Sequence, residues 1–171
     1  MTEARAYTDI DTLTERLRTV PYESVLRTIG RVAEREGIEA YAVGGMVRDV
    51  LLGRSTTDLD FVTVGPGTGI ALAEAVGEEL GGRTAHVYPK FGTAAIRIPA
   101  EEALPDGHPD DALVLEFVAA RTESYRSNSR KPIVEDGTLE DDQYRRDFTV
   151  NAMAIHLTPD RFGELIDPFD G

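Results

Sequence analysis

The sequence contains neither cysteine nor tryptophan in its 171 residues. Without cysteine there can be no disulfide, no zinc–cysteine site and no thiol nucleophile, so any metal has to bind oxygen or histidine. No apolar run approaches the roughly 20 residues that cross a bilayer, and the acidic N-terminus lacks the features of a signal peptide. We therefore expect a cytoplasmic protein with no membrane partner.

Lysine is nearly absent as well. Lys90 and Lys131 are the only two, so arginine supplies 16 of the 18 basic side chains, and 31 acidic residues give a formal net charge of -13. Such a balance argues against this chain binding a nucleic-acid backbone by itself. Arginine, however, is suited to forked contacts with individual phosphates. The length and the 41% hydrophobic content fit one globular domain.

Apolar periodicity predicts an alternation of helices and strands. Residues with helical spacing, each stretch ended by glycine, predict helices over 22–36, 46–52 and 68–80. Runs rich in β-branched and apolar residues predict strands at 40–43, 58–64, 84–88, 93–98, 113–120 and 153–157. The simplest account of 84–88 and 93–98 is a hairpin.

The polar segments between these elements are expected to be irregular. Residues 100–111 are acidic and contain Pro105, Gly107 and Pro109, which predicts an exposed loop. Residues 127–142 show no sustained period and predict a mobile loop. A helix is expected to start near Arg145, and a turn at 158–163 to return the chain through Leu165 and Ile166.

The central motif is the Asp-x-Asp of Asp58 and Asp60, which a period of two places on one face of a strand. Two carboxylates can bind one hard cation such as Mg²⁺, and a two-metal site commonly uses a third acid. Glu116 is the candidate, because it is the one charge inside an apolar strand and a buried carboxylate needs a partner. Taken alone, Asp-x-Asp is more simply two solvated acids at a strand margin.

Gly44 and Gly45 precede Arg48 where the second predicted helix begins. Glycines let a phosphate approach the backbone, a helix N-terminus favours anions, and an arginine there can add a forked contact. A glycine pair alone is usually a tight turn. Its coupling to Arg48 and to the aspartate pair favours the phosphate-binding interpretation.

Three ordered motifs resemble those of the family of CCA-adding enzymes (class II tRNA nucleotidyltransferases) and bacterial poly(A) polymerases. They are GGMVRDVLLGRSTTDLDFVTVG (44–65), RTESY (121–125) and RRDFTVNAMAI (145–155), and the similarity runs from about Tyr41 to Gly171. The resemblance implies an α/β (α+β) fold, the polymerase-beta-like nucleotidyltransferase head, with a mixed, largely antiparallel sheet flanked by helices. It also implies that 1–40 form a leading extension and helix of the head and 41–171 the catalytic head, with the family's neck, body and tail domains absent.

The resemblance also implies roles for single residues. Metal ligation falls to Asp58 and Asp60, with Glu116 as a supporting carboxylate. Nucleotide contacts fall to Gly44, Gly45, Arg48, Arg121, Arg145, Arg146, Asp147 and Asn151. Asp147 and Asn151 would lie near the ribose or brace that wall, although Asp near a helix start is often merely a cap. Without the motif, Arg145 and Arg146 would be a solvated helix start.

The implied reaction is attack of a tRNA 3′-hydroxyl on the α-phosphate of CTP or ATP at a two-Mg²⁺ site, with release of pyrophosphate. Because the residues that select the nucleotide and the RNA belong to the family's later domains, we expect the chain to bind Mg-nucleotide weakly and not to complete a tRNA end. The absence of those domains also accounts for the acidic net charge.

Several alternatives stay open. CCA addition is preferred over poly(A), CC or A addition, because RTESY and the DLDFVTVG strand look more like the tRNA enzymes. Small nucleotidyltransferases that modify drugs or proteins are disfavoured by RRDFTVNA. A non-catalytic nucleotide-binding module is disfavoured by the intact aspartate pair. His86, His108 and His156 are assigned no catalytic role, and buried packing is expected for Tyr125 and Phe148.

Overall fold

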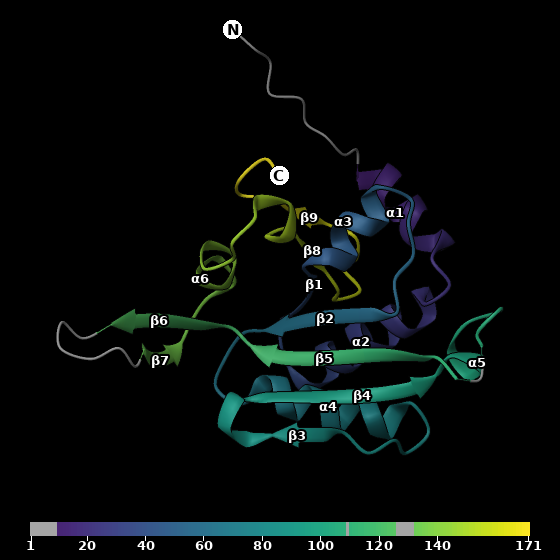
Figure 1. Ribbon diagram of the computed structural model, residues 1–171, viewed down its shortest axis with the longest axis horizontal. Coiled ribbons are helices and arrows are strands. Elements are labelled where there is room, and N and C mark those ends of the chain that lie inside the picture. The colour runs from purple at the N-terminus through teal and green to yellow at the C-terminus, as the bar shows by residue number, and fades with distance from the viewer. Residues whose placement is uncertain (1–9, 109, 126–131) are drawn as a thin grey trace, which may run out of the picture.

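The fold is built on one large sheet. The computed structural model describes residues 10–108, 110–125 and 132–171, and its sheet has the strand order β3-β4-β5-β2-β1-β8-β9 (Figure 1). β2 and β5 run parallel, and the other neighbouring pairs in this sheet are antiparallel. The predicted mixed, largely antiparallel sheet is therefore confirmed. Its strands are β1 (Ala40–Val43), β2 (Asp58–Thr63), β3 (His86–Tyr88), β4 (Thr93–Pro99), β5 (Ala112–Ala119), β8 (Ala154–His156) and β9 (Leu165–Ile166).

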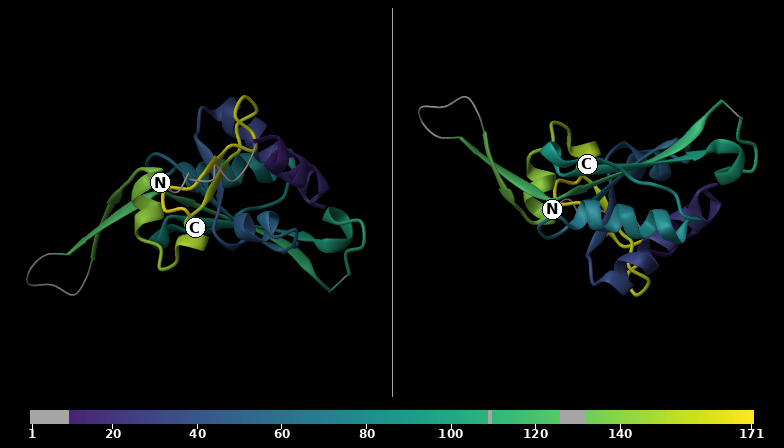
Figure 2. Two further views of the ribbon diagram at one scale, coloured as in Figure 1. Left: turned by 90° about the horizontal axis from the view of Figure 1, so that it is seen from above. Right: turned by 90° about the horizontal axis from the view of Figure 1, so that it is seen from below.

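Helices cover one face of this sheet and surround its β1 side. α4 packs against β4 and β5, and α2 packs against α4 (Figures 1 and 2). The first helix, α1, contacts both α2 and α3, and its Leu13 and Leu17 are fully buried in the main core. The helices are α1 (Ile10–Thr19), α2 (Glu23–Glu36), α3 (Gly45–Leu51), α4 (Thr68–Glu79), α5 (Ala100–Ala103) and α6 (Leu139–Tyr144), with short 3-10 turns η1 (Pro89–Phe91) and η2 (Thr149–Asn151). No helix in the described ranges is long and apolar enough to cross a membrane.

The two faces of β2 and β5 differ sharply. Burial alternates along both strands: Leu59, Phe61, Leu115 and Phe117 are fully buried on the helix side, whereas Asp60 lies on the opposite face and is exposed. The alternation follows from the period of two in an extended chain. The sheet therefore buries apolar side chains on one face and leaves acids on the other.

A second, smaller core covers part of the acidic face. Tyr41 and Val43 of β1 and Val62 of β2 point to this face, and Leu139 of α6 packs against their cluster. Leu139 is the first residue of α6, so the helix is attached here by its start. Its far end then leads directly to the Arg145–Arg146 pair.

β6 (Arg121–Tyr125) and β7 (Pro132–Asp136) form a separate antiparallel ribbon that reaches away from the large sheet (Figure 2). The prediction of a loop over 127–142 is therefore wrong for 132–136 and for the residues of α6, while 126–131 lie outside the described residues. Backbone pairing to β6 gives 132–136 an extended form that their own composition did not signal.

Other boundary predictions need smaller corrections. The chain at Arg145 is the C-cap of α6 and not a helix start, and Ala100–Ala103 form a short helix inside the predicted loop. α1 was not predicted. The predicted helices at 22–36, 46–52 and 68–80, the six strands and the hairpin of β3 and β4 are confirmed to within a few residues.

Candidate functional site

Three carboxylates share the open face of the sheet. Asp58 and Asp60 are two residues apart on β2, and Glu116 lies directly beside Asp60 in the parallel pairing of β2 and β5. The Glu116 backbone is central in the sheet, but its side chain is exposed, so the prediction that it is a buried acid is wrong. The strand alternation that buries Leu115 and Phe117 turns Glu116 outward.

The electrostatic surroundings of Asp60 disfavour its ionised form. Asp60 keeps an exposed edge, yet partial burial raises the pKa of its carboxyl, and the charges of Glu116 and Asp58 raise it further while Arg146 opposes them. Among the ion pairs between described residues, none includes Asp58, Asp60 or Glu116. This corner of the open face therefore holds negative charge without a paired cation.

Gly44 brings the backbone close to this acid. Its φ is 75°, a conformation that glycine adopts without strain. A Cβ at this position would lie 3.4 Å from Arg146 Nη1 and 3.6 Å from Asp60 Oδ2. A guanidinium and a carboxylate thus flank a backbone turn that carries no side chain.

Arg48 is fixed one turn of α3 further on. Its Nε donates to Asp49 Oδ1 at 3.1 Å, and its Nη1 donates to Asn151 Oδ1 at 3.0 Å. A Cβ at Gly45 would lie 3.1 Å from Arg48 Nη2, so the guanidinium folds back over the glycine turn. α3 has only seven residues, so most of the positive charge here comes from the arginine and not from the helix dipole.

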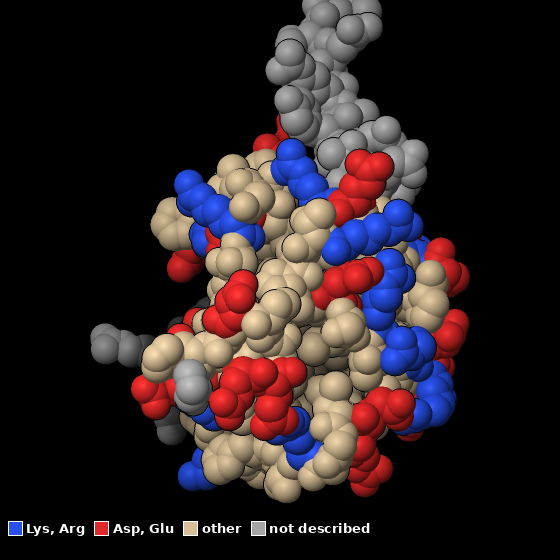
Figure 3. Space-filling model, turned by 90° about the vertical axis from the view of Figure 1, so that its right-hand side faces the viewer, with Lys and Arg blue, Asp and Glu red and all other residues tan. Residues whose placement is uncertain are grey.

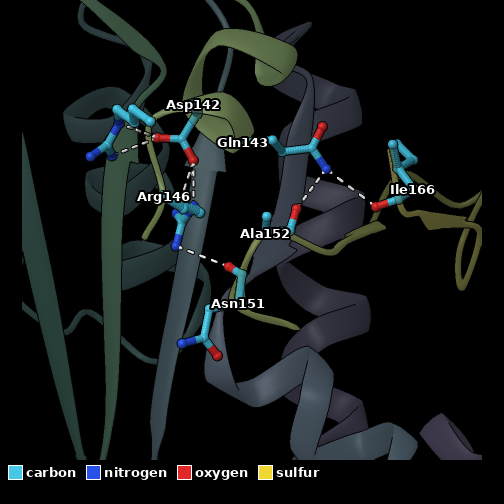
Figure 4. A network of polar contacts seen from close by, with 7 residues as sticks. Asp142, Gln143, Arg146, Asn151, Ala152 and Ile166 are labelled. Atoms are coloured by element: carbon cyan, nitrogen blue, oxygen red, sulfur yellow. Dashed lines mark hydrogen bonds and ion pairs between the residues drawn. The ribbon is translucent and has the colours of Figure 1, made fainter. Parts of the chain in front are cut away.

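Arg145 and Arg146 are held by one buried acid, Asp142. Asp142 Oδ1 accepts from Arg145 Nε at 3.0 Å and Nη2 at 2.6 Å, and Oδ2 accepts from Arg146 Nε at 2.9 Å (Figure 4). Arg146 Nη1 also reaches the backbone oxygen of Asn151 at 3.5 Å. Gln143, the next residue, donates to the backbone oxygens of Ala152 and Ile166 and so ties α6 to the following segment.

The remaining predicted residues lie around this centre. Arg121 is half-buried at the start of β6, opposite Asp136 in the ribbon, and Asp147 is exposed in the turn after α6. Their nucleotide contacts stay predictions. Phe148 is 66% exposed, so its predicted burial is wrong, while the side chain of Tyr125 lies outside the described residues.

The donor set fits Mg²⁺ held jointly by protein and substrate. In the part of the chain that the structure describes, no three His, Asp or Glu side chains form a ready-made metal-binding group. Mg²⁺ commonly binds one or two carboxylates and completes its shell with water and substrate phosphates. Asp58 and Asp60 can supply such a pair, and their unpaired charge favours a cation.

Sequence reasoning missed Asp142 and Asp49, which orient the arginines. The signal for α6 was present as Thr138 followed by Asp141, because the structure has a capping box between these two residues. Nothing comparable marked Asp142, since an acid next to two arginines in sequence is usually solvated. Charged side chains of both signs are intermingled on the surface in Figure 3, whereas the acid that pairs with these arginines is buried.

Comparison with known proteins finds a family model that matches most of the chain. Residues 40–171 match the profile of the poly A polymerase head domain. An A-adding tRNA nucleotidyltransferase of Geobacter sulfurreducens is 40% identical over 149 residues, 87% of this chain and 15% of that protein. One of Halalkalibacterium halodurans is 39% identical over 147 residues, 86% of this chain and 31% of that protein.

Solved structures agree with the sequences. A CCA-adding enzyme in complex with ATP matches with a TM-score of 0.70 and 32% identity over 96% of this chain and 34% of that chain. A tRNA nucleotidyltransferase with a primer tRNA and an incoming ATP analog matches with a TM-score of 0.63 and 38% identity, covering 82% of this chain and 34% of that chain. The chain thus spans about a third or less of the length of these relatives. The resemblance inferred from the three motifs is confirmed, and the chain belongs to the poly A polymerase head-domain family.

Proposed function

We propose that this chain is the catalytic head of a template-independent nucleotidyltransferase that adds C and A, from CTP and ATP, to the 3′ end of tRNA. The observation that carries the proposal is the approach of Asp60 and Arg146 to Gly44, because a carboxylate suited to a cation and a guanidinium suited to phosphate flank an open backbone turn. The names of the relatives, which include A-adding, CC-adding and CCA-adding enzymes, support tRNA as the acceptor.

Asp58 and Asp60 would hold Mg²⁺, with Glu116 beside them adding negative charge. Bound there, metal ions supply positive charge that activates the attacking oxygen and stabilises the leaving one. Arg146 and Arg48 bind the triphosphate by forked contacts, and Gly44 and Gly45 let it approach the backbone. Arg121 and Arg145 contribute further cationic contacts, while Asp147 and Asn151 face the ribose.

In the reaction the 3′-hydroxyl oxygen of the RNA attacks the α-phosphorus of the nucleotide. A new phosphodiester bond forms, the bond from the α-phosphorus to the bridging oxygen breaks, and pyrophosphate leaves with that electron pair. The hydroxyl proton passes to solvent. The chain contributes alignment and charge stabilisation, so no covalent enzyme intermediate is required.

We include α1 and α2 in the head together with the 40–171 region. Leu13, Leu17 and Leu26 are fully buried in the same core as Leu59 and Phe61 of β2. Removing the first two helices would expose that core, so the catalytic unit extends beyond the region that defines the family.

Addition of A alone is the second candidate. The observation that favours it is the identity of 40% and 42% to A-adding enzymes of Geobacter sulfurreducens and Aquifex aeolicus. The two candidates differ in the acceptor that they require, since an A-adding enzyme extends a tRNA that already ends in CC.

The test is nucleotide incorporation with the protein in molar excess over RNA. Labelled CTP or ATP is supplied with Mg²⁺ to tRNAs that end before CCA, after the first C, or after CC, and to an unrelated RNA. CCA addition predicts both nucleotides on the matching acceptors, whereas A addition predicts ATP on the CC end alone. Repeated A on the unrelated RNA would indicate poly(A) synthesis. Incorporation that persists in an Asp58→Asn/Asp60→Asn variant would contradict the proposal.

A further inference from the structure

Asp142 is a buried acid with no place of its own in the reaction described above. Its side chain is 0% exposed, while the carboxylates of the other described ion pairs are between 17% and 92% exposed. A buried carboxylate is costly unless it is paired and hydrogen-bonded. Replacing a buried ion pair by apolar residues often leaves stability unchanged. A contribution to stability is therefore a weak explanation for the presence of a buried aspartate at position 142.

The two oxygens of Asp142 divide the arginines between them. Oδ1 accepts from Arg145 and Oδ2 from Arg146, and Arg146 Nη2 lies 2.9 Å from the same Oδ2 that its Nε donates to. The Nε–Nη2 edge of Arg146 is therefore occupied. A guanidinium is planar and rigid, so fixing one edge fixes the direction of the rest.

The remaining nitrogen of Arg146 is directed at the open face. Nη1 is the atom nearest the position of a Cβ at Gly44, and the same position is 3.6 Å from Asp60 Oδ2. Among ion pairs of the described residues, none joins Arg146 to Asp60, although the two charges influence each other. Nη1 also reaches the backbone oxygen of Asn151 at 3.5 Å. Arg146 thus faces the acid across a gap, and its bonds to Asp142 and to the Asn151 backbone hold it in that direction.

We propose that Asp142 is a positioning residue, which holds Arg146 in the direction needed to contact the triphosphate of a bound nucleotide. The inference rests on the proposed function, since it assumes that a nucleotide binds between Asp60 and Arg146. α6 supplies the rigid support, because Leu139 anchors its start in the second core and Gln143 bonds to two backbone oxygens beyond it.

The variant Asp142→Asn separates positioning from simple electrostatics. Asparagine has the same shape, but an NH₂ group replaces one of the two oxygens. An NH₂ group cannot accept a hydrogen bond, so one of the two arginines loses its acceptor. By charge alone, loss of a negative group near the site would strengthen binding of the anionic nucleotide. Positioning predicts the opposite, a loss of about tenfold in Mg-ATP affinity, at the low end of what removal of an orienting partner costs.

The experiment is calorimetric titration of Mg-ATP into the wild type, D142N, R146A and the double variant. If Asp142 acts through Arg146, D142N costs about tenfold in the wild-type background and less than about twofold once Arg146 is already alanine. Val76→Ala, a core change on α4 away from the site, controls for destabilisation and should keep wild-type affinity.

Each other outcome has a distinct meaning. Unchanged or tighter binding by D142N, an equal loss in the R146A background, or an equal loss in V76A would overturn the positioning role. Failure of the wild type itself to bind Mg-ATP would instead overturn the proposed function and the inference with it. If D142N does not fold, R146K serves in its place: it keeps the charge, loses the fork and should bind about tenfold more weakly, and wild-type affinity in R146K would overturn the inference.

Discussion

The two faces of β2 and β5 carry alternate residues of the same two strands, yet their roles are opposite. On the helix side, the rings of Phe61 and Phe117 stack with centroids 5.0 Å apart, and both residues are fully buried. On the open side, Asp60 and Glu116 sit at the same register with like charges. The helix side stabilises the fold. On the open side the neighbouring carboxylates repel one another, and a bound cation can reduce that repulsion.

In this sheet a single strand therefore contributes to stability with one face and to chemistry with the other, and the cost of the second role is confined to the open face. A period of two keeps each set of side chains out of the other's environment. Substitutions on the helix side should therefore change stability and leave the charge pattern intact, whereas substitutions on the open side should change the charge pattern and affect stability only slightly.

The largest effect is expected on the buried face. Phe117→Ala removes a stacked, fully buried ring and should lower the free energy of unfolding by about 3–5 kcal/mol. Urea denaturation followed by circular dichroism measures it. A loss below about 1 kcal/mol would mean that this ring is not part of a close-packed core.

Gly44→Ala tests the turn between β1 and α3. With φ at 75°, alanine should cost about 1–2 kcal/mol of stability. Its methyl group would also lie between Arg146 and Asp60, so nucleotide affinity should fall as well. Gly53→Ala is the matched control, because Gly53 also has a positive φ of 68° but has open space around its Cβ position. Equal loss of affinity in both variants would contradict the placement of the site.

Asp60→Asn should act in the opposite sense on stability. Because burial and like charges raise the pKa of Asp60, the folded state disfavours its ionised form, and the cost appears as pH rises through the folded pKa. At neutral pH the neutral amide should therefore raise the thermal midpoint slightly, while Mg-dependent nucleotide binding is lost. A lower thermal midpoint of Asp60→Asn at neutral pH would show that the charge on Asp60 does not destabilise the folded state.

The smallest effect is expected at His156 of β8. Burial lowers the pKa of this histidine from its ordinary 6.5, and its ring packs against Tyr41 at 4.8 Å. The folded state thus binds fewer protons than the unfolded state, so stability falls as pH drops below about 6.5. His156→Gln should make stability flatter between pH 7 and 5 than in the wild type. Identical pH profiles would refute a contribution from this residue.

Much of the fold could be predicted from sequence because most elements have strong local signals. Val25, Ile29 and Val32 carry the period of α2, and the alternation of polar and apolar residues in β2 is enough to place Asp58 and Asp60 on one face. β7 escaped prediction because its extended form depends on pairing with the neighbouring strand β6. The start of α6 carried a local capping signal, but its docking on the second core had none.

For the candidate site, too, the features with a local sequence signal could be predicted and those set by packing could not. Motif resemblance identified the acids, the glycine turn and the arginines, but sequence could not give the burial of Asp142 or the exposure of Glu116 and Phe148. Those properties depend on which segments cover the open face. α6 covers the part next to Asp60, and no local pattern specified where it would dock.

The central claim is that Asp58 and Asp60 on the open face bind nucleotide through a divalent cation. Calorimetric titration of ATP and CTP, with and without Mg²⁺, into the wild type and the Asp58→Asn/Asp60→Asn variant tests it most directly. Binding should require Mg²⁺ and be abolished in the double variant, whose circular dichroism spectrum should match that of the wild type. Binding of equal strength without Mg²⁺, or undiminished binding by the double variant, would contradict it.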